Sequence, residues 1–152
     1  MTQNALTPEQ EAWLAALESG EYEQVQNALV STDNGRMCFC CLGLAVKTVE
    51  PTHYSLETGE WDHRSSEEMG LPIDDFQSAY GGGDGSCAPE IFMRLHLLDD
   101  WGEFRGGAVR FGVTSLAEMN DAVGLSFAEI AAFIRKEPWV VFTNFDKPEA
   151  AQ

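Results

Sequence analysis

Two helix-start signals lie close together in the last third of the chain and constrain its fold more than any other feature. Each is a serine followed three residues later by a glutamate: Ser115 with Glu118, and Ser126 with Glu129. In this spacing the serine hydroxyl accepts a hydrogen bond from the helix backbone, and the glutamate carboxylate accepts one from the serine N–H. Gly124 stands between the two starts and Pro138 lies beyond the second, at positions where helices commonly end. The pattern predicts a helical hairpin over residues 116–136.

The segment from Asn120 to Ala131 also has the residue order of a helix-turn-helix. A recognition helix needs cationic neighbours to hold phosphate, and this segment contains Asp121 and Glu129 with no lysine or arginine. We therefore interpret the hairpin as architecture and not as a reader of DNA.

The N-terminal region holds another well-specified helix. Thr7 can cap it, Pro8 suits its first position, Gln10 can complete a capping box, and Gly20 marks its end. Its apolar residues recur on one face: Trp13, Leu14 and Leu17. These signals predict a helix over residues 8–18.

Three further apolar patterns predict elements of the core. Residues 40–46 are apolar on nearly every side, which favours a buried central helix, with a buried strand as the alternative. A helical period that begins at Pro89 predicts a helix ending near Trp101 and Gly102. Residues 109–111 and 139–142 are short strand candidates that could pair as a ribbon.

The connecting segments carry weaker signals. Residues 22–29 have helical spacing without a good cap, so they are helical or partly extended, and Pro72 can open a short helix. The remaining expectations are a turn at 33–35, a long surface loop at 50–70, a glycine-rich loop at 81–88 and a frayed tail at 147–152. No Lys-Ser or Lys-Thr follows the glycines, so they do not predict a phosphate-binding loop.

Together these elements predict a mainly α fold: a compact single helical domain over residues 1–152, with a C-terminal helical hairpin and at most a small β ribbon. A chain of this length can bury about two-thirds of its unfolded surface. Its longest apolar runs are far shorter than the roughly 20 residues that span a bilayer. We expect a cytoplasmic protein that does not enter a membrane.

The cysteines are crowded. Cys38, Cys40 and Cys41 lie within four positions, and Cys87 is distant, which favours a reduced intracellular setting over a disulfide framework. Zinc ligation by these thiols with a histidine is one alternative, but neighbouring residues of a helix point about 100° apart, which does not suit one tetrahedral site. We therefore expect buried cysteines, no metal and no cofactor.

Catalysis is a minor alternative. Cys41 with a histidine and Asn120 or Asp121 would form a thiol hydrolase constellation, although nothing in the sequence brings a histidine near. We expect a protein without enzymatic activity.

Charge is the strongest compositional signal. The chain carries 25 acidic and nine basic residues, a formal net charge of −16, and residues 50–103 hold 13 acids against two arginines, a net charge of −11. Such a field repels nucleic acid and anionic membranes and attracts basic protein surfaces, although acidity can also serve solubility alone. The acidic pairs of this segment are the candidate partner-binding residues: Glu67, Glu68, Asp74, Asp75, Asp99 and Asp100.

A polar group of residues offers an alternative ligand pocket. Its candidate members are Tyr22, Gln24, Cys41, Asn120 and Asp121. The competing interpretation of Asn120 and Asp121 is structural, because Asn and Asp often bond to local backbone where a helix ends.

Several short motifs, in order, resemble a group of small phage and prophage proteins of no assigned activity. These motifs are Ser19-Gly20-x-Tyr22-x-Gln24, Cys40-Cys41-Leu42-Gly43, Leu71-Pro72, Leu116-x-x-Met119-Asn120-Asp121 and Ser126-Phe127-x-x-Ile130-Ala131. The chain departs from the group at Glu21, where a basic residue is expected, and in the acidity of its middle. The resemblance implies a phage accessory gene and hence interference with a host process.

These observations lead to two functional hypotheses. The first is a phage-encoded acidic protein that binds and inhibits a basic, nucleic-acid-handling host protein, such as a restriction or CRISPR component, without binding nucleic acid itself. The alternative is a protein that sequesters a small ligand or nucleotide in a pocket near Tyr22, Gln24, Cys41 and Asn120.

Overall fold

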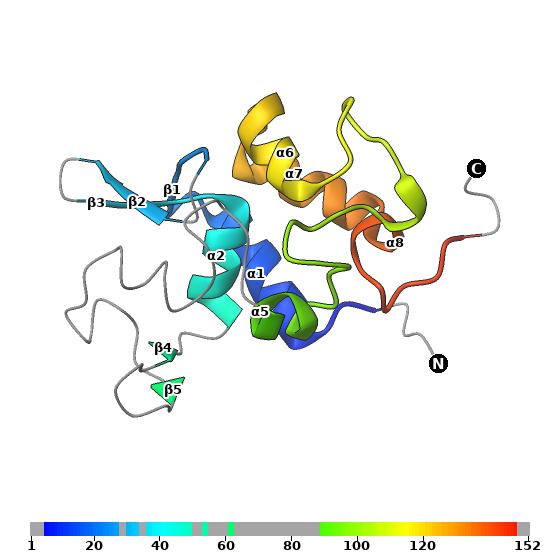
Figure 1. Ribbon diagram of the computed structural model, residues 1–152, viewed down its shortest axis with the longest axis horizontal. Coiled ribbons are helices and arrows are strands. Elements are labelled where there is room, and N and C mark those ends of the chain that lie inside the picture. The colour runs from blue at the N-terminus through cyan, green and yellow to red at the C-terminus, as the bar shows by residue number, and fades with distance from the viewer. Residues whose placement is uncertain are drawn as a thin grey trace.

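The computed structural model describes residues 5–27, 30–33, 36–49, 53–54, 61–62 and 89–148. Its helices are α1 (Pro8–Ser19), α2 (Cys41–Val49), α5 (Pro89–Arg94), α6 (Leu116–Glu118), α7 (Phe127–Lys136) and α8 (Pro138–Val141), with a 3-10 turn η1 (Arg105–Gly107) and a π turn η2 (Met119–Val123). The strands are β1 (Glu23–Gln24), β2 (Val30–Asp33), β3 (Arg36–Phe39), β4 (His53–Tyr54) and β5 (Trp61–Asp62). The described chain is mainly α with small sheets, as predicted (Figure 1).

The N-terminal helix α1 begins where its caps predict. The Thr7 hydroxyl accepts from the Gln10 N–H at 3.2 Å, and the Gln10 side-chain oxygen accepts from the Thr7 N–H at 2.8 Å. Gly20 ends the helix with φ of 75°, a left-handed conformation that costs a glycine little. The apolar face of α1 is buried: Trp13, Leu14 and Leu17.

Residues 22–29 contain an extended segment, one of the two conformations expected for them. Their strand β1 runs parallel to β3, which also pairs antiparallel with β2, so that the sheet order is β1-β3-β2. Asp33 lies opposite Arg36 across β2 and β3. The two residues between them lie outside the described chain.

The apolar run at 40–46 forms the buried helix α2, as predicted. Leu42, Leu44 and Ala45 are fully buried, and α2 packs against α1. The Trp13 indole N–H donates to the Cys41 carbonyl oxygen at 2.9 Å. This bond anchors the start of α2 on α1.

The helical hairpin over 116–136 is confirmed. The Ser115 hydroxyl accepts from the Glu118 N–H and the Ser126 hydroxyl accepts from the Glu129 N–H, both at 3.2 Å. At Ser126 the Glu129 carboxylate also accepts from the serine N–H at 3.1 Å, which completes the capping box. At Ser115 the predicted box is only half formed, because the Glu118 carboxylate accepts instead from the Thr114 and Ser115 hydroxyls. Between the two helices the chain forms the π turn η2, which the sequence signals did not predict.

The predicted ribbon between residues 109–111 and 139–142 is wrong. Residues 138–141 form α8, because Pro138 occupies its first turn, where the missing N–H costs nothing. Residues 109–111 belong to a turn in which Arg110 bridges to Val113 and Phe111 has φ of 53°. The small sheets of this fold lie instead in the N-terminal half.

The helix predicted to begin at Pro89 is shorter than expected. It ends at Arg94 and not near Gly102, because His96 has φ of 58° and Leu97 forms a bridge with Phe142. Leu98, which the helical period placed on the apolar face, is 47% exposed.

The two ends of the described chain share one hydrophobic core. The Trp13 and Phe142 rings meet edge to face with centroids 6.3 Å apart, and α1 lies against α7. The Gln10 side-chain amide donates to the Leu95 carbonyl oxygen and to the Asn144 side-chain oxygen, both at 2.9 Å. The N-terminal helix thereby completes the core of the C-terminal half.

Several predictions lie wholly or largely outside the described residues. They are the turn residues 34–35, the helix at Pro72, the glycine-rich loop 81–88, the tail beyond 148 and most of the loop 50–70, in which β4 and β5 pair antiparallel. In the part of the chain that is described, no helix is long and apolar enough to cross a membrane.

Candidate functional site

The polar residues proposed as a ligand pocket meet around Asn120, in the π turn η2. The Asn120 side-chain oxygen accepts from the Gln24 amide at 2.7 Å and from the Cys41 N–H at 3.2 Å. Its amide nitrogen donates to the Val25 carbonyl oxygen at 2.9 Å and to the Asp121 carboxylate at 2.8 Å. The structure therefore brings β1, α2 and the hairpin together at one fully buried amide.

This cluster has no spare hydrogen-bonding capacity at its centre. An asparagine side chain can donate two hydrogen bonds and accept two, and Asn120 makes all four within the chain. Gln24 is also committed, because its amide donates to the Leu125 carbonyl oxygen and its oxygen accepts from the Phe127 N–H. The arrangement is a structural tie, but it is not the local backbone bonding expected for Asn120, because three of its four partners are 79 or more residues away.

Two other members of the proposed pocket are also engaged. The Tyr22 ring packs edge to face on Phe39 with centroids 5.9 Å apart. The Asp121 carboxylate accepts from the Asn27 N–H at 2.9 Å. Both contacts hold the β1 segment against its neighbours.

The cysteines are buried, as expected for small apolar residues. Cys38, Cys40 and Cys41 are free thiols, and burial raises the pKa of the Cys40 thiol to about 12. The Cys41 thiol donates to the Leu116 carbonyl oxygen at 3.6 Å. Cys87 lies outside the described residues, and among those that are described no group of three or more His, Cys, Asp or Glu side chains could hold a metal ion.

Of the six candidate partner-binding acids, only Asp99 and Asp100 lie in the described chain. The Asp99 carboxylate accepts from the backbone N–H groups of Trp101 and Glu103, both at 3.0 Å, and so shapes a turn. Asp100 is half-buried. The other four are outside the description: Glu67, Glu68, Asp74 and Asp75.

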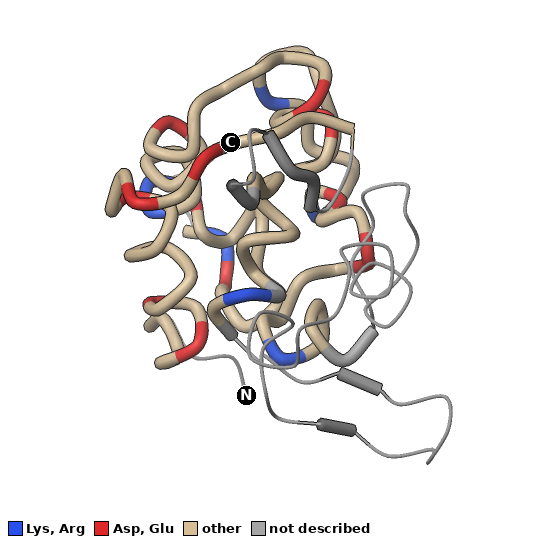
Figure 2. The backbone as a smooth tube through the Cα atoms, turned by 90° about the vertical axis from the view of Figure 1, so that its left-hand side faces the viewer, with Lys and Arg blue, Asp and Glu red and all other residues tan. Residues whose placement is uncertain are grey.

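The N-terminal region adds acidic charge that the sequence argument overlooked. The first basic residue of the chain is Arg36, and residues 5–27 contain five glutamates. Figure 2 shows the acidic positions spread over the described chain, with fewer basic ones between them. A count of charge in successive windows would have found this stretch.

No carboxylate is buried among the residues whose exposure is described, where the buried polar side chains are Gln10, Ser115 and Asn120. Burying an unpaired charge is far more costly than leaving it in water. The acidic residues in that part of the chain therefore contribute their charge at the surface.

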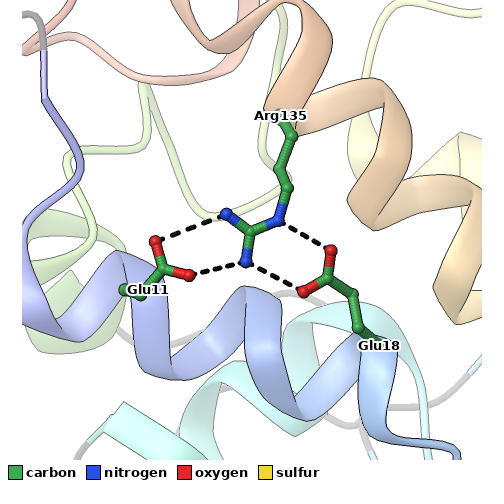
Figure 3. Close-up of polar contacts among 3 residues, drawn as sticks. All are labelled: Glu11, Glu18 and Arg135. Atoms are coloured by element: carbon green, nitrogen blue, oxygen red, sulfur yellow. Dashed lines mark hydrogen bonds and ion pairs between the residues drawn. The ribbon is translucent and has the colours of Figure 1, made fainter.

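Two arginines are paired with glutamates of the same chain. Arg135 on α7 reaches across to α1, where its guanidinium lies 2.6 Å from the Glu11 carboxylate and 2.7 Å from that of Glu18 (Figure 3). The hydrogen bond from Arg135 lowers the pKa of Glu18. A second ion pair joins Arg110 to Glu137 at 2.9 Å, and its hydrogen bond lowers the pKa of Glu137. Both guanidinium groups are neutralised by carboxylates within the chain.

Comparison with known proteins gives one match. The model of a family described as Domain of unknown function (DUF8296) matches residues 8–77, which is less than half of this chain and extends from α1 past β5. No curated protein and no solved structure matches the chain.

Proposed function

We propose that this chain is a phage-encoded, non-enzymatic acidic protein of the host cytoplasm. In this proposal it binds and inhibits a basic, nucleic-acid-handling host-defence protein of the restriction or CRISPR type. The acidic segment over residues 50–103 occupies the partner surface that normally holds phosphates.

The observation that carries the proposal is where the charged side chains of the described chain lie and which of them are paired. Arg110 and Arg135 are bound by glutamates of the same chain, while no carboxylate is buried wherever exposure is described. With a net charge of −16 the acids far outnumber the basic residues, and the carboxylates whose exposure is described lie at the surface. A surface of this kind accelerates encounter with a basic partner and disfavours nucleic acid.

The burial of Cys41 and the hydrogen bonds of Asn120 support a binding role over catalysis. Cys41 is fully buried, and Asn120 bonds to its backbone N–H and not to its thiol. A thiol hydrolase needs an accessible thiolate within reach of a base. The first condition is not met, because the Cys41 side chain is fully buried.

Charge reversal tests the proposal. The tagged full-length chain is used to capture proteins from host lysate, and each captured protein is assayed for nucleic-acid binding with and without the chain. The variant E67K/E68K/D74K/D75K should associate more slowly with a captured basic partner and should restore that partner's nucleic-acid binding. Circular dichroism of the variant, recorded beside that of the unaltered chain, checks that the fold is retained.

A matched control separates the local segment from total charge. Glu21 is an exposed acid outside the segment, so Glu21→Lys changes the net charge as Glu68→Lys does. The proposal expects Glu68→Lys to slow association more than Glu21→Lys does. Association should also weaken as salt shortens the Debye length, which is about 8 Å near physiological ionic strength. Binding that is insensitive to salt, or full inhibition by the fourfold variant, would contradict the proposal.

A further inference from the structure

A pocket of about 470 Å³ opens between the η1 segment and α8, outside the polar cluster around Asn120. Its lining includes Arg105, Ala108 and Arg110 from η1 and the residues after it, together with Trp139 of α8 and Lys147. The η1 turn contacts α8, and Figure 1 shows the two side by side. The volume of the pocket falls in the range of about 300–1,000 Å³ that is usual for small-molecule sites.

The pocket is cationic in an acidic protein. Three of the chain's nine basic residues line it, and no aspartate or glutamate among the described residues does. Arg110 is neutralised by Glu137, which holds it through two hydrogen bonds of 2.9 and 3.0 Å. Arg105 and Lys147 leave two positive charges without a carboxylate in the lining.

The Arg105 guanidinium is fixed in position and still has N–H groups that make no hydrogen bond to the described residues. A single nitrogen, Nη1, donates to the backbone oxygens of Trp139, Phe142 and Phe145. Those bonds hold the guanidinium against the end of α8, and its Nε and Nη2 make no hydrogen bond to the described residues. A guanidinium held by its surroundings loses little freedom when it binds an anion through its free edge.

Lys147 and Trp139 complete a mixed surface. Lys147 is exposed and forms no ion pair or hydrogen bond with any residue in the described part of the chain. Trp139 is half-buried and brings a flat aromatic ring to the lining, with Val140 and Ala108 as apolar neighbours. Small-ligand sites typically combine such apolar walls with a few convergent polar groups.

We propose that this pocket binds a small anion that carries a planar ring, of about the size of a nucleoside monophosphate. The free edge of Arg105 and the Lys147 ammonium hold the anionic group, and the ring lies against Trp139. The described residues of this site all belong to the C-terminal part of the chain, and the proposal does not depend on the function proposed above.

The test is calorimetric titration of the full-length chain with four probes. Adenosine monophosphate and benzoate carry both a ring and a charge, adenosine carries only the ring, and inorganic phosphate carries only the charge. At least one ring-bearing anion should bind saturably at a dissociation constant near or below about 1 mM and more tightly than adenosine and phosphate do. If only adenosine monophosphate does so, the ligand is a nucleoside phosphate; if benzoate binds equally well, it is an aromatic carboxylate.

A matched pair of lysine variants locates the site. Lys147→Gln should weaken binding about two- to fivefold, as expected for loss of one exposed charge contact. Lys136→Gln removes the same charge from an exposed lysine that does not line the pocket and should leave the affinity unchanged.

The variant Trp139→Leu tests the aromatic contact. It should weaken the binding of both ring-bearing anions and leave the binding of phosphate unaffected. Absence of saturable binding by both ring-bearing anions, adenosine binding as tightly as its phosphate, or equal loss in both lysine variants would overturn the proposal.

Discussion

Replacing Asn120 by alanine should destabilise the fold more than any other single change in the polar cluster. The substitution removes four hydrogen bonds at a fully buried position. One of them matters most, because Cys41 begins α2 and its N–H has no partner within that helix. The Asn120 oxygen therefore acts as a cap for α2 supplied from 79 residues away.

The expected cost is the sum of unequal parts. A buried backbone N–H left without an acceptor costs about 1–3 kcal/mol, and this applies to Cys41. Gln24 and Val25 are half-buried, so water can replace their bonds at about 0.5–1.5 kcal/mol each. With a small contribution from the cavity, Asn120→Ala should lower the free energy of unfolding by about 4 kcal/mol.

Urea denaturation followed by circular dichroism measures this cost. The midpoint should fall with the slope unchanged, as for a loss of stability without a change in the unfolded state. Gln26→Ala, at an exposed position, serves as the control and should shift stability by about 0.5 kcal/mol or less. A loss of less than about 1 kcal/mol in Asn120→Ala would refute the view that this amide ties the three segments together.

Three further predictions concern a helix cap, a buried thiol and metal content. Ser126→Ala should cost about 1 kcal/mol in the same assay through loss of its bond to the Glu129 N–H, and an unchanged midpoint would contradict that role. Because burial raises the pKa of Cys40 to about 12, a thiol reagent at about pH 8 should label Cys40 in the native chain far more slowly than in guanidinium; equal rates would show the thiol to be accessible. Elemental analysis should find no stoichiometric zinc, whereas one tightly bound equivalent would identify the cysteines as ligands.

The elements that could be predicted are those whose signals are local. The starts of α1 and α7 depend on a hydroxyl and a side chain three residues away, so the caps at Thr7 and Ser126 are readable from sequence alone. The prediction of a β ribbon was wrong because the local composition did not decide the conformation of these residues. The apolar run 139–142 has strand-like composition, but Pro138 and burial against the core place it in a helix.

The features that could not be predicted depend on contacts between distant residues. The end of α5 is set by a bridge between Leu97 and Phe142, and the parallel pairing of β1 with β3 joins strands of which one is only two residues long. In the candidate site, the sequence placed Gln24 and Asn120 in one group but could not show that their side chains hydrogen-bond to each other. It also missed the cationic pocket, because Arg105 and Lys147 are 42 positions apart and no local pattern relates them.

The Gln10–Asn144 bond and the Trp13–Phe142 contact bear on how this protein is made. They join residues separated by 134 and 129 positions, so α1 cannot reach its final environment until nearly the whole chain has left the ribosome. Contacts of such high sequence separation slow folding, because a long loop must close before they form. The segment matched by the family model stops at residue 77 and lacks Phe142 and α7, which pack against α1. Expressed alone, it would expose the part of α1 that they cover, so the boundary of sequence similarity does not mark an autonomous folding unit.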